Sequence, residues 1–162
     1  FDVVGRERKV VTYDMLMKAM DEQDAHPEAG DLMFFYTGFA DVILEAGKNP
    51  THEQMHQSCA ALDGRDDKLL QWITDSGVTA MIADNYAVEQ SPARPAPGKT
   101  YANSPLHQHC LFKLGVPLGE IWFLTELAQF LKANKRSKFF TVCPPIRLPG
   151  AVGSPANGVA VV

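Results

Sequence analysis

The sequence predicts an α/β fold, a mixed β-sheet with flanking helices. Short apolar and β-branched runs alternate with amphipathic segments at the spacing of crossover units, which favours a mixed or parallel sheet covered by helices. The chain has 162 residues with a hydrophobic content of 46%, which is sufficient to bury one core. We therefore expect a single domain over residues 1–162.

The first half of the chain provides most of the predicted elements. Thr12 is a good N-cap, and apolar residues recur after it at helical spacing, which predicts a helix over 13–24. The aromatic, apolar run over 32–36 is typical of a buried strand. Similar patterns predict three further helices and then a strand, over 39–46, 52–62, 66–75 and 78–82.

The second half begins with a proline-rich segment over 90–99. We interpret it as an ordered surface loop or lid rather than a domain linker, because the chain on either side is too short to fold well alone. Gly115 is expected to interrupt the helical pattern that follows. The remaining predictions are two helical segments and two late strands, over 105–114, 125–133, 139–142 and 159–162.

Charge and composition exclude several classes of partner. The net charge is −4 and no long run of Lys or Arg occurs, so we expect neither nucleic acid nor a membrane surface as a partner. The apolar runs are far shorter than a membrane span, and no secretory leader precedes them. The three cysteines are widely spaced and fit reduced thiols, which predicts a cytoplasmic protein. Because the chain starts with Phe1 rather than Met, we also expect it to be a processed or partial form.

The segment His52-Glu53-Gln54-Met55-His56 matches the H-E-x-x-H motif of zinc peptidases. On a helix, positions i and i+4 would place both imidazoles on one face, with the Glu beside a bound water. However, the motif would occupy an exposed first helical turn. No spacing selects a third ligand among the downstream carboxylates Asp75, Asp84 and Glu89. We therefore favour a polar helix start on the surface and keep a zinc peptidase as an alternative.

Two other polar residues have more than one interpretation. Asp84 follows a predicted strand, where α/β proteins often place functional groups, but a helix cap or a turn role fits equally well. His109 is interpreted as mostly structural.

A second pattern connects His107 to Glu120 through a turn. The helix expected from His107 ends at Gly115, Pro117 stiffens the return, and Gly119 allows a close backbone approach. Glu120 precedes a run of apolar residues, where an unpaired charge would be costly. This pattern favours a metal or a histidine as the partner of Glu120.

The segment over 106–122, LHQHCLFKLGVPLGEIW, resembles part of the cyclase family that includes bacterial kynurenine formamidase. In that family a His starts a short helix, a Gly-x-Pro-x-Gly turn follows, and a Glu comes 13 residues after the His, as His107 and Glu120 do here. In the segment over 30–39, which also resembles the family, Tyr36 and Phe39 stand where the family usually has Arg and Trp. The substrate contacts that the family makes from this strand are therefore not carried over. Three more segments resemble the family in the correct order, over 30–39, 72–89 and 153–160.

The resemblance implies a kynurenine formamidase-like fold and a metal-dependent hydrolase of small amides, formamides or cyclic amides, with zinc or manganese. The family binds its metals chiefly through a His-x-Gly-Thr-His-x-Asp-x-Pro-x-His segment, which this sequence does not contain. We therefore expect a carboxy-terminal portion of such a protein, incomplete at the amino terminus, which alone can lack the metal. By resemblance, Glu120 is a metal ligand, and His107 is a metal ligand or a catalytic group.

The expected partners are a small-molecule amide substrate and either further copies in a homo-oligomer or the missing amino-terminal segment. A noncatalytic, metal-free protein of the same fold is the remaining alternative to a hydrolase.

Overall fold

The computed structural model describes residues 6–98 and 100–162 and has an α/β fold, as predicted. The chain divides into two compact units, Phe1–Thr125 and Glu126–Val162. The single domain expected over residues 1–162 stays a prediction. Across the described residues, no helix combines the length and the apolar character needed to cross a membrane.

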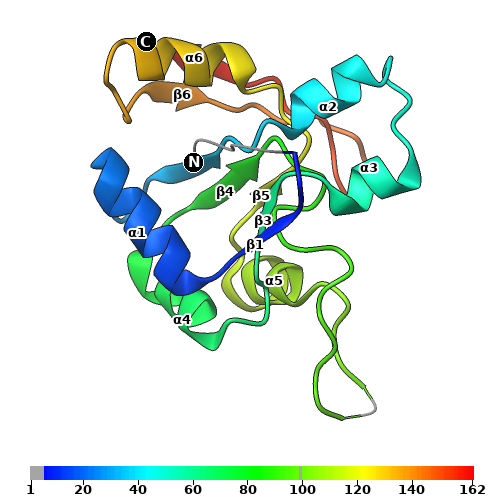
Figure 1. Cartoon of the computed structure of the whole chain (residues 1–162). Coiled ribbons are helices and arrows are strands. Elements are labelled where there is room, and N and C mark those ends of the chain that lie inside the picture. Colours follow the sequence, from blue (N-terminus) through cyan, green and yellow to red (C-terminus); the bar gives the residue numbers. More distant parts are fainter. Residues whose placement is uncertain (1–5, 99) are drawn as a thin grey trace. The chain divides into compact units, whose positions relative to one another are not determined.

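The strands of the first unit form two small parallel sheets instead of one mixed sheet (Figure 1). One sheet has the order β2-β4-β5, formed by β2 (Leu32–Phe35), β4 (Ala80–Ala83) and β5 (Leu118–Gly119). The other pairs β1 (Lys9–Val11) with β3 (Ala60–Leu62). Both strands predicted in the first half are confirmed with small shifts at their ends, whereas the two-residue β5 is too short to give a sequence pattern.

Three helices of the first unit match the predicted amphipathic segments: α1 (Tyr13–Gln23), α2 (Phe39–Glu45) and α4 (Asp67–Ser76). Thr12 precedes α1 in extended conformation, as an N-cap does, but its side chain makes no capping hydrogen bond. Asp66 caps α4, because its Oδ1 accepts hydrogen bonds from Lys68 N and Leu69 N at 3.0 and 3.3 Å.

The helix predicted over 52–62 is wrong beyond residue 57. The helix α3 (His52–Gln57) stops before Ser58, Cys59 adopts a left-handed φ of 61°, and the chain continues as β3. The three residues of β3 are buried and pair with β1. This burial and pairing outweigh the intrinsic helix propensity of Ala and Leu.

The helical segment predicted over 105–114 is present, but its hydrogen-bond pattern changes along its length. The helix α5 (Pro105–His107) continues as a π-helix, η1 (Gln108–Leu114), and Gly115 follows with a left-handed φ of 70°. Pro105 is at the start of α5, where its missing N–H would have no helical partner. π-Helical turns are rare, and those that occur are often at functional sites. The π-helix that begins directly after His107 therefore marks this region as a candidate functional site.

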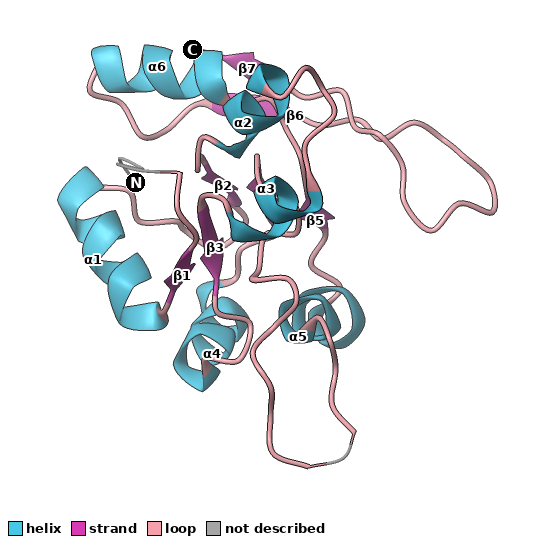
Figure 2. Ribbon diagram, turned by 45° about the vertical axis from the view of Figure 1, so that its right-hand side comes forward, coloured by secondary structure: helices cyan, strands magenta, loops and turns pink. Residues whose placement is uncertain are grey.

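The core of the first unit is built from the inner faces of α1, α4 and α5 and from the parallel strands (Figure 2). Beside this core, α4 and η1 are connected by Thr74 Oγ1 and His109 Nε2, which lie 2.9 Å apart. The core residues that are at most 1% exposed are Val11, Leu16, Leu69, Ile73, Met81, Ala83, Val88, Leu106 and Cys110.

The second unit contains most of α6 (Thr125–Ala133) and an antiparallel pair, β6 (Phe140–Val142) and β7 (Val159–Val161). Main-chain bonds between Ile146 N and Pro155 O (3.0 Å) and between Asn157 N and Pro144 O (3.2 Å) lie in the chain between these strands. The helix and both strands predicted here are confirmed within one residue at their ends.

Candidate functional site around His107

His107 lies between two carboxylates. Its Nδ1 is 2.7 Å from Glu89 Oε1, and its Nε2 is 3.0 Å from Glu120 Oε1. The side chains of His107 and Glu120 are 28% and 33% exposed, so the pair is accessible from solvent, whereas that of Glu89 is 1% exposed. The structure thus brings together the two residues singled out in the sequence, and it adds a buried third group.

Glu89 serves the helix start and the imidazole at once. Its Oε2 accepts a hydrogen bond from Leu106 N, and its Oε1 accepts one from His107 N, both at 3.0 Å. These amides belong to the first turn of α5, where N–H groups have no partner within the helix. The Glu89 carboxylate therefore caps α5 and fixes the direction of the His107 ring through Nδ1.

Gly64 lies so close to the Glu89 carboxylate that position 64 has no room for a side chain. A Cβ atom at position 64 would lie 2.1 Å from Glu89 Oε2 and 3.0 Å from Leu106 N. Because the carboxylate is buried and held by three hydrogen bonds, it has little freedom to give way. The absence of a side chain at Gly64 is thus a condition for the contact between Glu89 and His107.

Glu120 follows β5 and reaches His107 from the opposite side. Among the described residues, Glu120 Oε1 is a buried atom without a hydrogen bond of normal geometry, so its contact with His107 Nε2 is an ion pair. Gly119 allows the close approach expected from the sequence, because a Cβ there would lie 3.0 Å from Ile82 Cγ1. Trp122, three residues further along, packs edge-on against Phe34 of β2 with ring centroids 6.1 Å apart.

The two carboxylates change the protonation of His107. They raise its pKa to about 9, with the contact to Glu120 as the largest cause and the hydrogen bond to Glu89 next, while burial opposes the shift. At neutral pH the ring is therefore a cation in this state, with N–H donors directed at both carboxylates. Such a ring can give up a proton, but it has no free lone pair until it does so.

Asp84 has a structural role at the end of β4. It is fully buried, and its carboxylate accepts hydrogen bonds from the amides of Thr37 (2.8 Å), Gly38 (2.8 Å) and Phe39 (3.0 Å) and from the Thr37 hydroxyl (2.6 Å). Burial raises the pKa of Asp84 despite these hydrogen bonds. Of the two interpretations left open by the sequence, the geometry is that of a cap, because these donors form the start of α2.

The HEQMH motif forms a short surface helix, α3, as expected. Thr51 and Gln54 make a capping box at its start. The rings of His52 and His56 are 4.3 Å apart between centroids, and His56 Nδ1 is 3.0 Å from Ser91 O. Within residues 6–98 and 100–162, no three His, Cys, Asp or Glu residues are grouped in a way that could hold a metal ion.

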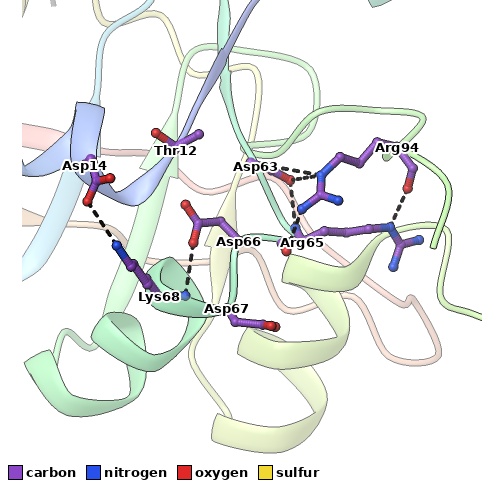
Figure 3. Close-up of a pocket in the computed structure, with 8 residues that line it drawn as sticks. All are labelled: Thr12, Asp14, Asp63, Arg65, Asp66, Asp67, Lys68 and Arg94. Carbon is purple, nitrogen blue, oxygen red and sulfur yellow. Dashed lines mark hydrogen bonds and ion pairs between the residues drawn. The ribbon is translucent and has the colours of Figure 1, made fainter. Parts of the chain in front are cut away.

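A shallow depression of about 460 Å³ lies at the start of α1 and α4 (Figure 3). Its charged groups largely satisfy one another: Arg94 Nε is 3.1 Å from Asp63 Oδ2, and Lys68 Nζ is 3.6 Å from Asp14 Oδ1. Asp66 Oδ2 also accepts a hydrogen bond from Tyr13 N at 2.7 Å. We therefore assign this depression a structural role. It is lined by Thr12, Asp14, Asp63, Arg65, Asp66, Asp67, Lys68 and Arg94.

Two arginines of this depression anchor the proline-rich loop that joins Glu89 to His107. Arg65 donates to the carbonyl of Arg94, and Arg94 donates in return to Arg65 O at 2.8 Å (Figure 3). Arg65 also donates to the carbonyl of Ala102 at 2.6 Å. Arg65 also lies over the Tyr101 ring, 4.9 Å from its centroid. Specific contacts therefore hold the described part of this loop at Arg94 and Ala102, in agreement with the expected ordered surface loop, while Lys99 lies outside the described residues.

Sequence reasoning missed the pairing of Glu89 with His107. From the sequence, Glu89 is only one of several possible third ligands for the HEQMH motif and part of a segment that resembles the cyclase family. The two residues are separated by 18 positions and by the proline-rich loop. No local spacing predicts such a contact, because it depends on how the loop returns to the parallel strands.

Comparison with solved structures gives the class of fold. The chain is similar to a crystal structure described as that of a novel cyclase, with a TM-score of 0.74 and 29% sequence identity over 94% of this chain. It spans 46% of that protein, which is less than half its length. No protein-family model and no curated protein matches the sequence. The chain therefore has a cyclase-family fold.

Proposed function

We propose that His107 and Glu120 are part of a divalent metal site in a hydrolase that acts on small amides, formamides or cyclic amides. The similarity in fold to a cyclase supports this class. The observation that carries the proposal is the 3.0 Å approach of His107 Nε2 to Glu120 Oε1 in a half-buried position. The proposal concerns the protein of which this chain forms all or part.

The donor atoms suit such a metal. A neutral imidazole nitrogen and a carboxylate oxygen are ligands that zinc and manganese accept. Glu120 Oε1 is buried, and its contact with His107 Nε2 is an ion pair without normal hydrogen-bond geometry. Once Nε2 has released its proton, a metal cation there would replace the charge of the imidazolium. The pair supplies two ligands, and the described residues contain no group of three. By resemblance, the remaining ligands belong to the histidine-rich segment of the cyclase family.

The residues of this chain have separate roles in the proposal. Glu89 holds Nδ1 of His107, which leaves Nε2 directed at Glu120, an arrangement common behind metal-bound histidines. His107 must release its proton before Nε2 can bind a cation. A bound metal would lower the pKa of a water molecule and polarise an amide carbonyl. Glu120 would then be a metal ligand, and His107 would either bind the metal through Nε2 or, with Nε2 free, accept or donate a proton of the attacking water.

Metal binding and hydrolysis by matched variants test the proposal. In the longest native polypeptide that contains this sequence, Glu120→Gln should weaken zinc and manganese binding by ~10-fold or more and reduce hydrolysis with it. His107→Ala should abolish turnover with partial retention of metal. Titration calorimetry and a panel of formamides and cyclic amides provide the measurements, and Glu53→Gln on α3 is the control.

Two outcomes of this experiment would contradict the proposal. Unchanged metal affinity in Glu120→Gln would remove the pair from the site. A complete polypeptide that binds no metal and hydrolyses no amide would instead favour a noncatalytic protein of this fold. The 162-residue chain alone should not hydrolyse amides, because the residues that the structure describes contain no group of three ligands to hold a catalytic ion.

A further inference from the structure

Two β-branched residues next to the site carboxylates have left-handed backbone conformations. Val88, directly before Glu89, has a φ of 56°, and Ile121, directly after Glu120, has a φ of 55°. β-branched residues rarely adopt positive φ, because the side chain crowds the backbone, and such strain persists only where surrounding contacts enforce it. Each carboxylate that contacts His107 is thus adjacent to an enforced backbone position.

Asn85 makes contacts that enforce both positions. Its side-chain Oδ1 accepts a hydrogen bond from Val88 N at 2.7 Å, and its Nδ2 is 3.3 Å from Val88 O. Its backbone carbonyl accepts a hydrogen bond from Ile121 N at 2.9 Å. Asn85 is 2% exposed, so these contacts form away from solvent.

The sheets fix Asn85 itself. It follows β4 by two positions, and its Nδ2 donates to Ala60 O of β3 at 2.9 Å. Leu62 of β3 donates to Val88 O at 3.0 Å and accepts from Gln90 N at 2.8 Å, so the backbone around Glu89 is held from the same strand. Asn85 therefore connects the β1-β3 pair with the β2-β4-β5 sheet at the point where the two carboxylates emerge.

We propose that Asn85 is a positioning residue that holds Val88 and Ile121 in left-handed conformations and thereby sets Glu89 and Glu120 on opposite sides of His107. The amide side chain suits the contacts to Val88 and Ala60 because it donates and accepts at once, whereas Ile121 is held by the backbone carbonyl of Asn85. Aspartate at position 85 would keep the acceptor for Val88 N but would lose both donated hydrogen bonds. The inference rests on the proposed function for its meaning. The arrangement of side chains that it describes, however, can be tested in the protein without metal or substrate.

The hydrogen bond between His107 Nδ1 and Glu89 provides a direct readout. In protein labelled with ¹⁵N-histidine, the Nδ1 proton of His107 should give a downfield resonance, assigned by its loss in His107→Gln. Asn85→Ala and Asn85→Asp should shift or remove this resonance in folded protein. Met20→Ala, which removes buried apolar surface on α1, should leave it in place and so controls for a general loss of stability.

A rescue experiment separates positioning from packing. Glycine adopts positive φ without support, whereas alanine does not. Asn85→Ala combined with Val88→Gly should therefore restore the resonance, while Asn85→Ala combined with Val88→Ala should not, although both remove most of the buried Val88 side chain. Equal behaviour of the two double variants, or a wild-type resonance in folded Asn85→Ala, would overturn the inference.

A further test uses the unmodified protein, so its result does not depend on whether a variant folds. Backbone couplings and ¹³C shifts report φ at Val88 and Ile121, and a negative φ at either residue would overturn the inference. Positive φ at both, with slow amide exchange at both, would support it. Because these measurements need no metal, their failure leaves the proposed hydrolase function standing. If the spectra are as expected but the protein binds no metal, the proposed function is contradicted and the role of Asn85 is not.

Discussion

At His107, protonation and folding are coupled, because the ring is a better base in the folded protein than in the unfolded chain. Its pKa rises from an ordinary value near 6.5 to about 9 between Glu89 and Glu120. A raised pKa stabilises the fold fully below the unfolded value and loses that contribution as pH rises through the folded value. The metal-free protein should therefore lose stability as the pH rises from about 6.5 to about 9, by at most ~3 kcal/mol.

Denaturant unfolding at several pH values measures this loss, with His107→Gln as the control that should flatten the curve. The buried thiols of Cys59 and Cys110, whose pKa values rise to about 11 and about 12, lower stability only where the unfolded thiols ionise. The difference between the two proteins below that range isolates His107. A curve that is identical in His107→Gln would exclude the two-carboxylate environment in solution.

Gly64 permits a second test at the residue scale. Gly64→Ala would place a Cβ against the Glu89 carboxylate and Leu106 N, and overpacking of this kind costs ~1–3 kcal/mol. It should also perturb the His107 Nδ1 resonance, since Glu89 must move. The matched control is Gly153→Ala, where a Cβ would meet nothing within 4 Å. Equal stability of the two variants, with an unchanged resonance, would show that Glu89 yields freely.

Only part of the site can be predicted from the sequence, and there is a physical reason why the other residues cannot. His107 and Glu120 are close enough along the chain, with Gly115, Pro117 and Gly119 between them, for their convergence to be expected from turn chemistry and resemblance. Glu89, Asn85 and Gly64 act through contacts made when the proline-rich loop and β3 come together. Such contacts have no local periodicity, so pattern reasoning cannot reach them.

At the scale of elements, prediction succeeds where one local pattern dominates. The segments of α1 and α4 have a regular apolar face, and their predicted ends are accurate to within one residue. The segment over 52–62 contains a helix and a strand in succession, and its apolar end, Ala60–Leu62, is compatible with either. Pairing with β1 decides the outcome there, which is tertiary information.

The short helix α3 gives a prediction for the HEQMH motif. Replacing both His52 and His56 with Gln should leave the metal content unchanged, because the described residues add no third ligand to this pair and the helix spans six residues. Metal analysis of the purified double variant, beside Glu120→Gln, provides the measurement. Loss of bound zinc from the double variant, with retention in Glu120→Gln, would favour the zinc peptidase alternative.

At the scale of the molecule, the first unit presents large apolar side chains to solvent near the site. Leu111 and Ile121 are 49% and 48% exposed, Phe123 is 54% exposed, and Phe112 on η1 is 85% exposed. Among the described residues, β1 and β2 are also sheet edges with pairing on one side only. Exposed apolar groups and open strand edges both favour association between chains.

We therefore expect the purified chain to self-associate, with a mass by light scattering above the 17.8 kDa of one chain and rising with concentration. Association driven by apolar burial should persist at high salt, which screens charged contacts but not apolar ones. Phe112→Asp should lower the measured mass, because it removes the most exposed aromatic side chain among the described residues and adds a charge at its position. Val152→Asp, at a fully exposed residue of the second unit, is the matched control and should have little effect. A mass of one chain at all concentrations would contradict the prediction, and an equal effect of both substitutions would place the contact away from η1.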